Sequence, residues 1–479
     1  MATAWSTIFE QLGENALEAS WARHAKTSSS FCSGAFTAEL ALAAQQSIVN
    51  ASGLVEWKMD VSPIACWDPL LHCVCAARFF WFCDQGHYSR VLPQEKKPEC
   101  HQLIVDGARW CHQVAPTQTP PSLPCVFQDA EDINPCFVEA DATETYGQKK
   151  RRILKSKMMT QGFCSTHQRM CAWPSAEGDV HFDCSGLPCT DMSRAGKQQK
   201  RHGKTASVYV THAKYCRECK IPLVVIECTT DARHGLMKEL DVGMIEDLYG
   251  GDYNWYQVLA EPEDVGHAGV ARKRTYLIGA HSGRTEILHD PFELWHAVSS
   301  DLREMVRTRP RDYFVAPRHE VEREAARLAA RRGKAYRPRR QDLSYLLTDR
   351  ELDTMRALSK NYQDCYGRKA SEDDDLVAFL GDSYSYTKTW SAVSNKIPTF
   401  RTSVRSGIMW SFKHRRFMTS KEKLVCMGWP VVQPVWEGME VPPIPAQDIE
   451  RASDLVGNGM HFTVVGVIQL LALCCFGPL

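Results

Sequence analysis

The stretch from Val180 to Gly196 places one cysteine where it could react. An apolar run ends in Gly186-Leu-Pro-Cys189, a turn that would hold Cys189 at the end of a strand. A cysteine reacts as its thiolate, and nearby basic residues or a helix dipole could lower the pKa of this thiol. Because most cysteines are inert, chemistry at Cys189 requires further groups elsewhere in the chain.

Two further groups could act with this thiol. Glu227 ends the continuous apolar run that begins at Ile221, which is typical of a strand buried on both faces of a parallel sheet. Arg272 and Arg274 lead into another apolar run, and residues two apart in an extended segment point to the same side. The sequence therefore predicts a thiol, a carboxylate and two guanidinium groups near strand ends.

Strand patterns alternate with helical patterns along the chain. They predict a doubly wound, mostly parallel α/β sheet, whose ligands bind at the carboxyl ends of the strands. Residues 31–42 fit a first strand, a turn at Gly34 and a helix, and residues 54–60 fit a second strand that ends in Asp60. A glycine in the first turn lets a cofactor approach the backbone, and a carboxylate after the second strand can accept hydrogen bonds from a ribose.

The two ends of the chain are expected to be helical. Trp5 to Arg23 fits a helix, and the apolar tail from Phe462 to Phe476 fits a buried terminal helix. The tail is too short for a membrane anchor and contains Gln469, so we expect no membrane partner. The first residues lack a basic region followed by an apolar run, so no secretory signal is expected.

Composition leaves several classes of protein open. The 479 residues include 57 Lys and Arg and 57 Asp and Glu, so nucleic-acid binding would depend on local basic patches. Most of the 20 cysteines precede residue 230, and without a secretory signal they are expected to be reduced. The basic run 148–157 fits a solvated helix face, or a nuclear-localisation or phosphate-contact segment. A second basic stretch, 197–204, fits a mobile loop over a phosphate backbone.

Taken in order, these motifs resemble the C5-cytosine methyltransferase family over residues 31–475. The resemblance includes Gly-x-Pro-Cys at 186–189, Glu227 after a strand, Arg-x-Arg at 272–274, a large insert, and Gly428-Trp-Pro430. Thr419 and Glu422 also match the family's element before Gly428, and Gly457-Asn458 matches its closing element. The resemblance implies a Rossmann-like methyltransferase fold with an inserted target-recognition domain.

The resemblance also implies the division of the chain. We expect an N-terminal extension (1–30), a catalytic core with Cys-rich insertions (31–282), a target-recognition domain (283–412) and a return to the core (413–479). The inserted domain would contact DNA through arginines. The candidates are Arg323, Arg327, Arg331 and Arg332 on one helix face, and Arg337, Arg339 and Arg340.

By this resemblance the chain transfers a methyl group from S-adenosylmethionine to C5 of a cytosine flipped out of double-stranded DNA. Cys189 would add to C6, Glu227 would hold N3 and the exocyclic amine, and Arg272 and Arg274 would contact the base and its neighbouring phosphate. The expected cofactor-binding residues are Phe31, Gly34, Asp60, Asp129, Pro188, Gly457 and Asn458. Asp141 is an alternative to Asp129. Such an enzyme would work in the nucleus, or in the cytoplasm of a prokaryote.

The chain departs from the family pattern at four places. Phe36 replaces a second glycine of the nucleotide turn, Thr190 replaces glutamine after the cysteine, and Glu-Cys-Thr at 227–229 replaces Glu-Asn-Val. The glutamine expected before Arg272 is not clearly present. Three alternatives therefore stay open: an RNA cytosine-C5 methyltransferase, a catalytically inactive DNA-binding relative, and a zinc-dependent interaction module.

The zinc alternative depends on a small set of possible ligands. Cys164-x-x-His167 and Cys171 lie within the Cys-rich region, and Cys216-x-x-Cys219 follows. Only one of these is a true Cys-x-x-Cys pair, so the sequence favours reduced structural thiols and no bound metal.

Overall fold

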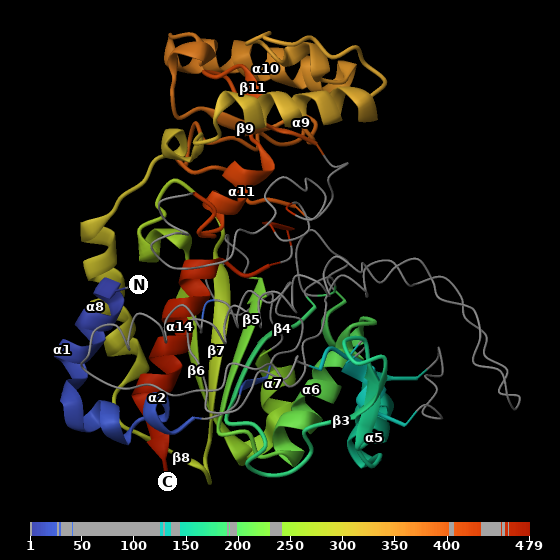
Figure 1. Cartoon of the computed structure of the whole chain (residues 1–479), viewed down its shortest axis with the longest axis vertical. Coiled ribbons are helices and arrows are strands. Elements are labelled where there is room, and N and C mark those ends of the chain that lie inside the picture. The colour runs from blue at the N-terminus through green and yellow to red at the C-terminus, as the bar shows by residue number, and fades with distance from the viewer. Residues whose placement is uncertain are drawn as a thin grey trace, which may run out of the picture.

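The computed structural model describes residues 2–25, 28–29, 41, 125–127, 130–135, 144–188, 191, 199–229, 242–401, 407–432, 452, 456–457 and 459–479. Figure 1 shows a larger part built around a central sheet, with helices on both of its faces. A smaller part with α9 (Arg318–Arg331) and α10 (Asp349–Tyr366) lies beyond one end of the sheet. Both termini lie in the larger part.

The central sheet has the strand order β1-β4-β5-β7-β6 within the described residues. The strands are β1 (Ser28–Ser29), β4 (Phe182–Gly186), β5 (Leu223–Thr229), β6 (Tyr253–Ala260) and β7 (Arg274–His281). β1, β4 and β5 run parallel, whereas β7 is antiparallel to both of its neighbours, β5 and β6. The predicted α/β fold class is confirmed, with a mixed sheet, and β6 is a strand that the sequence analysis did not predict.

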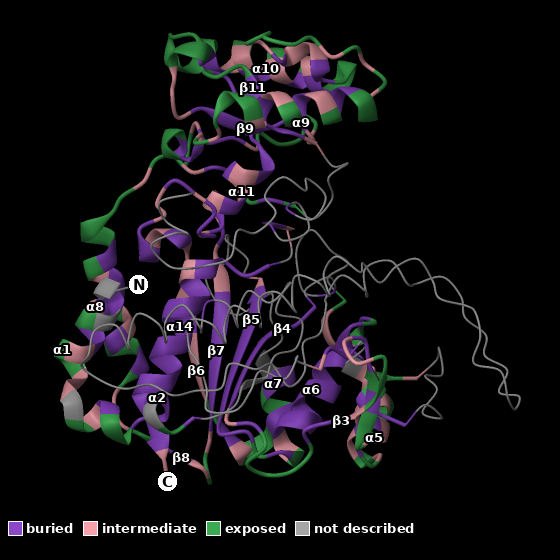
Figure 2. Cartoon of the chain, in the orientation of Figure 1, coloured by how far each residue is buried: buried purple, intermediate pink, exposed green. Residues whose placement is uncertain are grey.

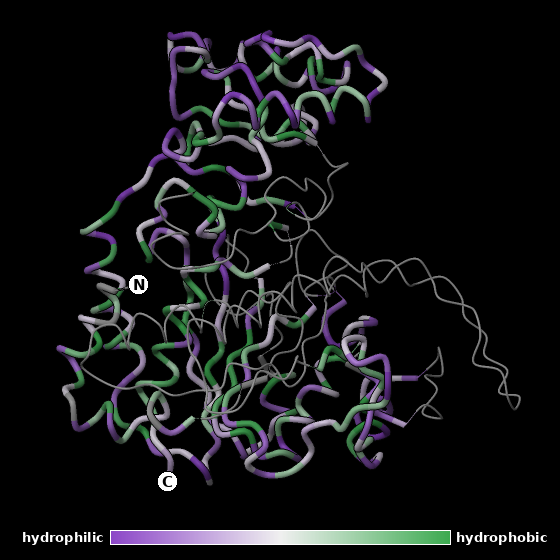
Figure 3. The backbone as a smooth tube through the Cα atoms, in the orientation of Figure 1, coloured by the Kyte–Doolittle hydropathy of each residue, from purple (hydrophilic) through white to green (hydrophobic). Residues whose placement is uncertain are grey.

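The central strands are buried on both faces, as their continuous apolar runs predicted. Leu223 and Val225 face one hydrophobic core, and Val224 and Ile226 face the other. This alternation follows from the two-residue period of a strand. Figure 2 shows these strands as almost continuously buried, and Figure 3 shows hydrophobic residues concentrated along them.

Helices cover both faces of the sheet (Figure 1). α6 (Ala206–Glu218) packs with α5 (Tyr146–Lys155) and α7 (Val242–Tyr249) on one side. α14 (Phe462–Cys475) contacts β5 on the other side, together with α8 (Pro291–Met305) and α1 (Ala2–Ala19). The structure thus has the three layers that a doubly wound sheet requires.

The C-terminal helix is buried, as predicted. Within α14, every residue except Thr463 is buried. The chain then ends in β12 (Phe476–Pro478), which pairs antiparallel with β8 (Thr285–Ile287). In the described part of the chain, no helix is both long and apolar enough to cross a membrane.

The predicted N-terminal helix is divided in two. α1 ends at Ala19, and α2 (Trp21–His24) begins after Ser20, whose hydroxyl donates to the carbonyl of Leu17 at 2.7 Å. α1 packs against α8 and α14, and the hydroxyl of Thr7 donates to Asp301 at 2.8 Å. The N-terminal helices are therefore part of the hydrophobic core of the larger part.

The inserted region has a hydrophobic core of its own. This core includes Leu328 of α9, Leu358 of α10 and Trp410, so it joins the two helices to a three-stranded antiparallel sheet. The strands of that sheet are β9 (Val377–Phe379), β10 (Met409–Ser411) and β11 (Arg416–Phe417). α8 follows the boundary predicted at residue 283, but its apolar face (Leu294, Val298) packs in the core of the larger part.

The segment after β11 returns the chain to the larger part. α11 (Ser420–Cys426) begins with a capping box, in which Thr419 and Glu422 each accept a backbone N–H of the other. The N–H of Phe462, the first residue of α14, donates to the carbonyl of Met427 at 2.8 Å. The Gly-Trp-Pro segment therefore packs on the start of α14, where Trp429 lies 5.3 Å from Phe462 between ring centroids.

Replacing Gly428 with alanine should lower the free energy of unfolding by about 2–4 kcal/mol. Gly428 has φ +74°, and an added Cβ would lie 2.6 Å from Oγ1 of Thr463 and 2.7 Å from His461. Urea denaturation would measure the loss. Gly333→Ala is the control, because Gly333 has φ +62° but no heavy atom within 4 Å of an added Cβ. Equal losses in both variants would contradict a role for the contact with α14.

Candidate active site

The carboxyl ends of β4 and β5 lie side by side. Gly186, the last residue of β4, pairs with Glu227 near the end of β5. Cys189 and Thr190 lie outside the described residues, but Pro188 directly precedes Cys189 and is buried. The sheet register therefore brings Gly186, the first residue of the Gly-x-Pro-Cys motif, and Glu227 to the same edge of the sheet.

The residues on both sides of Cys189 are held by hydrogen bonds. The hydroxyl of Tyr209 in α6 donates to the carbonyl of Pro188 at 3.2 Å. On the other side, the carboxylate of Asp191 accepts from the backbone N–H and the hydroxyl of Thr205, at 2.8 and 2.9 Å. The first contact joins Pro188 to α6, and the second joins Asp191 to Thr205, the N-cap residue of α6.

Glu227 forms an ion pair with Arg274. The distance from Nε of Arg274 to Oε1 of Glu227 is 3.0 Å, and the two side chains are 12% and 10% exposed. Cross-strand pairing places Tyr276 opposite Glu227, so both side chains lie on the face covered by α14. The carboxylate is therefore held in a fixed orientation at the sheet edge.

Tyr276 adds a neutral hydroxyl to this edge. Its side chain is fully buried, and its hydroxyl has no hydrogen-bond partner among the described residues. Burial raises the pKa of Tyr276 well above its ordinary value, so the phenol keeps its proton. A buried donor beside a carboxylate suits a site that binds a polar ligand.

Arg272 lies at the same edge as Arg274 but makes different contacts. It is 3% exposed, and its guanidinium donates to the carbonyls of Val456, Gly457 and Gly459. Arg272 thus holds Gly457 and Gly459 against the strand edge. Its expected contact with the target base stays a prediction, and nothing in the local sequence indicated its contacts with these carbonyls.

The expected cofactor residues fall into two groups. Pro188 and Gly457 are described, and both lie at this edge through the contacts of Tyr209 and Arg272. The others lie outside the described residues: Phe31, Gly34, Asp60, Asp129 and Asn458.

β1 runs parallel to β4, with Ser29 opposite Asp183, so β1 points toward the carboxyl edge of the sheet. In a doubly wound sheet a nucleoside cofactor binds at that edge.

A buried polar network supports β4 from the opposite face, and the sequence analysis missed it. Nε2 of His212 in α6 lies 2.9 Å from Oδ1 of Asp183, which also accepts from the hydroxyl of Ser185 at 2.7 Å. Nδ1 of His212 is hydrogen-bonded to the hydroxyl of Tyr249 in α7. The network joins β4 to α6 and α7, the layer that also holds Pro188.

His461 should make the closing segment sensitive to acid. It is 1% exposed, and its Nδ1 accepts the backbone N–H of Val464 at the start of α14. Burial, reinforced by nearby His267 and Arg272, holds the pKa of His461 well below its ordinary value. The unfolded chain binds a proton near pH 6.5 that the folded chain does not bind. This contribution to stability is therefore complete above pH 6.5 and decreases as the pH falls.

Between pH 7.5 and 5.5, His461 should therefore remove about 1.4 kcal/mol from the free energy of unfolding. His461→Asn keeps a side chain that can cap α14 but does not titrate. Urea denaturation of both proteins at the two pH values measures the difference. The same decrease in the variant would show that other groups cause the loss.

The mixed α/β sheet, with these residues at its carboxyl edge, fits a Rossmann-like methyltransferase fold. Residues 140–434 match the family model described as C-5 cytosine-specific DNA methylase. The chain therefore belongs to the C-5 cytosine-specific DNA methylase family, which makes it a methyltransferase that acts on C5 of cytosine. The matched range includes Cys189, Glu227, Arg272 and Arg274.

A comparison with solved structures found chains that align with most of this one. The Dnmt2 methyltransferase of S. pombe has 11% identity, with 94% of this chain and 98% of that chain covered and a TM-score of 0.44. A DNA modification methyltransferase encoded within an E. coli prophage has 14% identity, 93% and 99% coverage and a TM-score of 0.42. No curated protein matches this sequence.

Proposed function

We propose that the chain transfers a methyl group from S-adenosylmethionine to C5 of a cytosine flipped out of DNA, through a covalent bond between Cys189 and C6. The pairing of Gly186 with Glu227 carries this proposal, because it puts a buried carboxylate beside the segment that leads to Cys189. The fixed positions of Pro188 and Asp191 on either side of Cys189 support it.

Each residue has a distinct task in this reaction. The thiolate of Cys189 adds to C6, which makes C5 nucleophilic enough to attack a methyl group. Glu227 holds N3 and the exocyclic amine and shares a proton as charge develops, while Arg274 orients its carboxylate. A base then removes the proton from C5, and Cys189 is expelled. Bound S-adenosylmethionine supplies the electrophilic methyl group.

The cofactor would lie between the first strand and the closing segment. The backbone near Gly34 would approach it, Asp60 would accept hydrogen bonds from its ribose, and Asp129 would contact its adenine. The contacts of Arg272 support this placement, because they hold Gly457 at the edge where the cofactor would bind. Equilibrium binding of S-adenosylmethionine to the purified chain tests whether the cofactor binds.

A covalent-trapping experiment tests the proposal. With 5-fluorocytosine the proton at C5 is replaced by fluorine, so the base cannot be released and Cys189 stays attached. We expect a DNA oligonucleotide to form an adduct that survives denaturing electrophoresis, requires S-adenosylmethionine and is lost in Cys189→Ala. An adduct with only the matching RNA would favour the RNA methyltransferase. Cofactor binding without any adduct would favour the inactive relative.

We propose that α9, in the smaller part of the structure, contacts DNA through three arginines. Arg323, Arg327 and Arg331 are exposed and lie four residues apart on α9, opposite the buried Val321 and Leu328. Side chains at this spacing form one stripe along a helix. The stripe suits contacts with successive phosphates. Arg332 instead pairs with Glu351 at 2.6 Å, and Arg337 and Arg340 lie over the ring of Tyr345.

Replacing Arg323, Arg327 and Arg331 together with glutamine should weaken DNA binding. The logarithm of the binding constant falls as the logarithm of the salt concentration rises. Loss of three phosphate contacts should make this dependence shallower by about 2.7. Fluorescence anisotropy at several salt concentrations measures both effects. Arg350→Gln with Arg356→Gln on α10 is the control, since both side chains are exposed. An equal change in the control would assign binding to net charge instead of this stripe.

We propose that the protein works in the nucleus, as its DNA substrate implies, or in the cytoplasm of a prokaryote. The basic run 148–157 supports a nuclear signal only in part. It forms most of α5, where Lys150 pairs with Asp247 and Arg152 with Glu144, while Arg151 and Lys155 are exposed. Imaging of a fluorescent fusion in a eukaryotic cell tests this localisation.

A further inference from the structure

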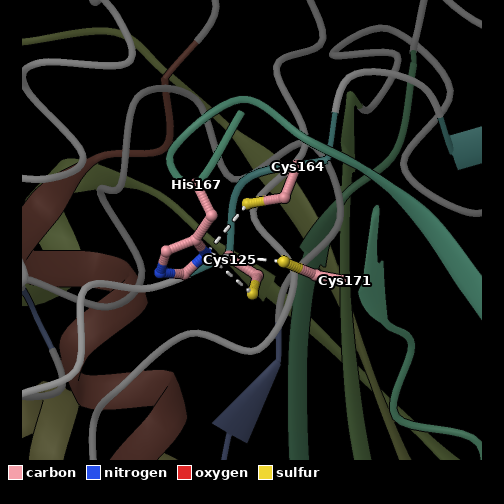
Figure 4. A group of neighbouring side chains, drawn as sticks. All are labelled: Cys125, Cys164, His167 and Cys171. Atoms are coloured by element: carbon pink, nitrogen blue, oxygen red, sulfur yellow. Dashed lines mark hydrogen bonds between the residues drawn. The ribbon is translucent and has the colours of Figure 1, made fainter. Parts of the chain in front are cut away.

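Four side chains outside the candidate active site converge on one point. Cys125, Cys164, His167 and Cys171 place their three sulfur atoms and one ring nitrogen within 4.8 Å of one another (Figure 4). The distances from Nδ1 of His167 to the sulfur atoms are 3.5 Å for Cys125, 3.3 Å for Cys164 and 3.5 Å for Cys171.

These separations match the edges of a tetrahedron around a zinc ion. With Zn–S bonds of about 2.3 Å and Zn–N bonds of about 2.05 Å, tetrahedral geometry puts a sulfur and a nitrogen ligand about 3.5 Å apart. The three measured S–N distances lie within about 0.2 Å of that value. The four donor atoms can therefore surround one ion with little movement.

Hydrogen bonding alone does not account for the arrangement. All three sulfur atoms approach the same nitrogen, and Nδ1 of a neutral imidazole has a single lone pair, which can accept from only one thiol. Neutral thiols and one ring nitrogen would not need to meet at a common centre. A cation at that centre gives every one of the four atoms a partner.

The fold brings the ligands together from two segments. Cys164 and Cys171 lie on β2 (Gln161–Cys164) and β3 (Arg169–Ala172), which form an antiparallel hairpin, and His167 lies in its turn. Cys125 arrives on another segment, fixed by a bridge between Phe127 and Cys164 and by a 2.8 Å hydrogen bond from the N–H of Ser165 to the carbonyl of Val126. The ligand geometry therefore rests on backbone pairing.

Packing beside the cluster holds the same two segments together. The rings of Phe127 and Trp173 are stacked with centroids 3.7 Å apart. An added Cβ at Gly162 would lie 2.6 Å from the ring of Trp173. The backbone of β2 therefore packs closely against this ring.

We propose that Cys125, Cys164, His167 and Cys171 bind one Zn²⁺ ion. Three thiolates and one imidazole fill all four positions of a tetrahedral ion, which is typical of a structural site with no open position for catalysis. The ion would fasten the segment that begins at Cys125 to the β2–β3 hairpin. That segment continues into η2 (Ala130–Ile133), which packs on α6. The proposal does not depend on methyl transfer.

The four ligands in the structure differ from the possible zinc ligands named in the sequence analysis. The sequence analysis grouped Cys164, His167 and Cys171 with Cys216 and Cys219, and favoured no metal. In the structure Cys216 lies in α6 beside Asp183 and His212, and Cys219 donates to the carbonyl of Pro174. The fourth ligand is Cys125, which is distant in sequence and belongs to no Cys-x-x-Cys pair.

Metal analysis of the purified full chain tests the proposal. We expect about one zinc ion per chain by elemental mass spectrometry, and less than about 0.2 in Cys171→Ser. Cys365→Ser should keep its zinc, because Cys365 is exposed and lies in α10, in the smaller part of the structure. Cys171→His restores a zinc ligand and should recover most of the metal. If Cys171→Ser keeps about one zinc ion per chain, Cys171 is not a ligand.

Cobalt replacement gives a readout that does not depend on variants. The wild-type chain, stripped of metal by a chelator and reloaded with Co²⁺, should show the absorption of a tetrahedral ion with thiolate ligands. Its melting temperature should fall on chelation and recover when zinc is added. A wild-type protein that contains no zinc and gives no thiolate–cobalt absorption would overturn the proposal, as would one iron per chain in place of zinc.

Discussion

Replacing Glu227 with glutamine should lower the rate of methyl transfer by about 10²- to 10⁴-fold. Glutamine has almost the same shape, but it cannot share a proton with the cytosine ring as charge develops. It also breaks the 3.0 Å ion pair with Arg274, which orients the carboxylate. Transfer of labelled methyl groups to DNA under saturating S-adenosylmethionine would measure the effect.

The loss should come from chemistry at the sheet edge and not from unfolding. Asp252→Asn is a matched control, because Asp252 also forms a 2.7 Å ion pair with an arginine, Arg217. That pair lies before β6, whose first residue, Tyr253, pairs with the far end of β7, away from Glu227. The control should keep its activity, and Glu227→Gln should still bind S-adenosylmethionine. Near-normal turnover in Glu227→Gln would remove Glu227 from the mechanism.

Glu422→Ala should lower the free energy of unfolding by about 3–5 kcal/mol. Glu422 is fully buried, forms two hydrogen bonds with the guanidinium of Arg416 at 2.6 and 2.8 Å, and accepts the N–H of Ala316 at 3.0 Å. It also accepts the N–H of Thr419 at 2.8 Å. Its removal would leave the charge of Arg416, which is 11% exposed, without its buried partner.

Two variants separate the buried ion pair from the helix cap. Glu372 caps a short helix, η8 (Ala370–Glu372), in the same way but is exposed, so Glu372→Ala should cost no more than about 1 kcal/mol. Glu422→Gln keeps an acceptor for the cap but removes the charge, so its loss should fall between the other two. Denaturant unfolding measures all three proteins. Equal losses in Glu422→Ala and Glu372→Ala would contradict a role for the buried charge pair.

Much of the fold follows from local patterns. The apolar runs near residues 182, 223 and 274 became β4, β5 and β7, and the apolar tail became the buried helix α14. Strand and helix periodicity depend on neighbouring residues, so they can be read from short windows. The order β5-β7-β6 could not be read in this way, because pairing between strands depends on contacts distant in sequence.

The candidate site shows the same division. Glu227 and Arg274 were predicted from their places at strand ends, and the register confirms that they lie together. Arg272 belongs to the same Arg-x-Arg motif, but its contacts are with carbonyls of residues 456–459, distant in sequence. Arg274 pairs with Glu227, whereas Arg272 binds backbone carbonyls near the C-terminal end of the chain. The position of those carbonyls cannot be predicted from the Arg-x-Arg motif.

By itself, the sequence determined the α/β class and the order of the chemical groups along the chain, since residue type and short periodicity carry that information. Only the tertiary structure decided which groups meet. It paired Gly186 with Glu227, packed Gly428 on α14 and brought Cys125 to the hairpin of Cys164 and Cys171. The physical reason is that these contacts depend on sheet register and packing between distant segments, which no short stretch of sequence specifies.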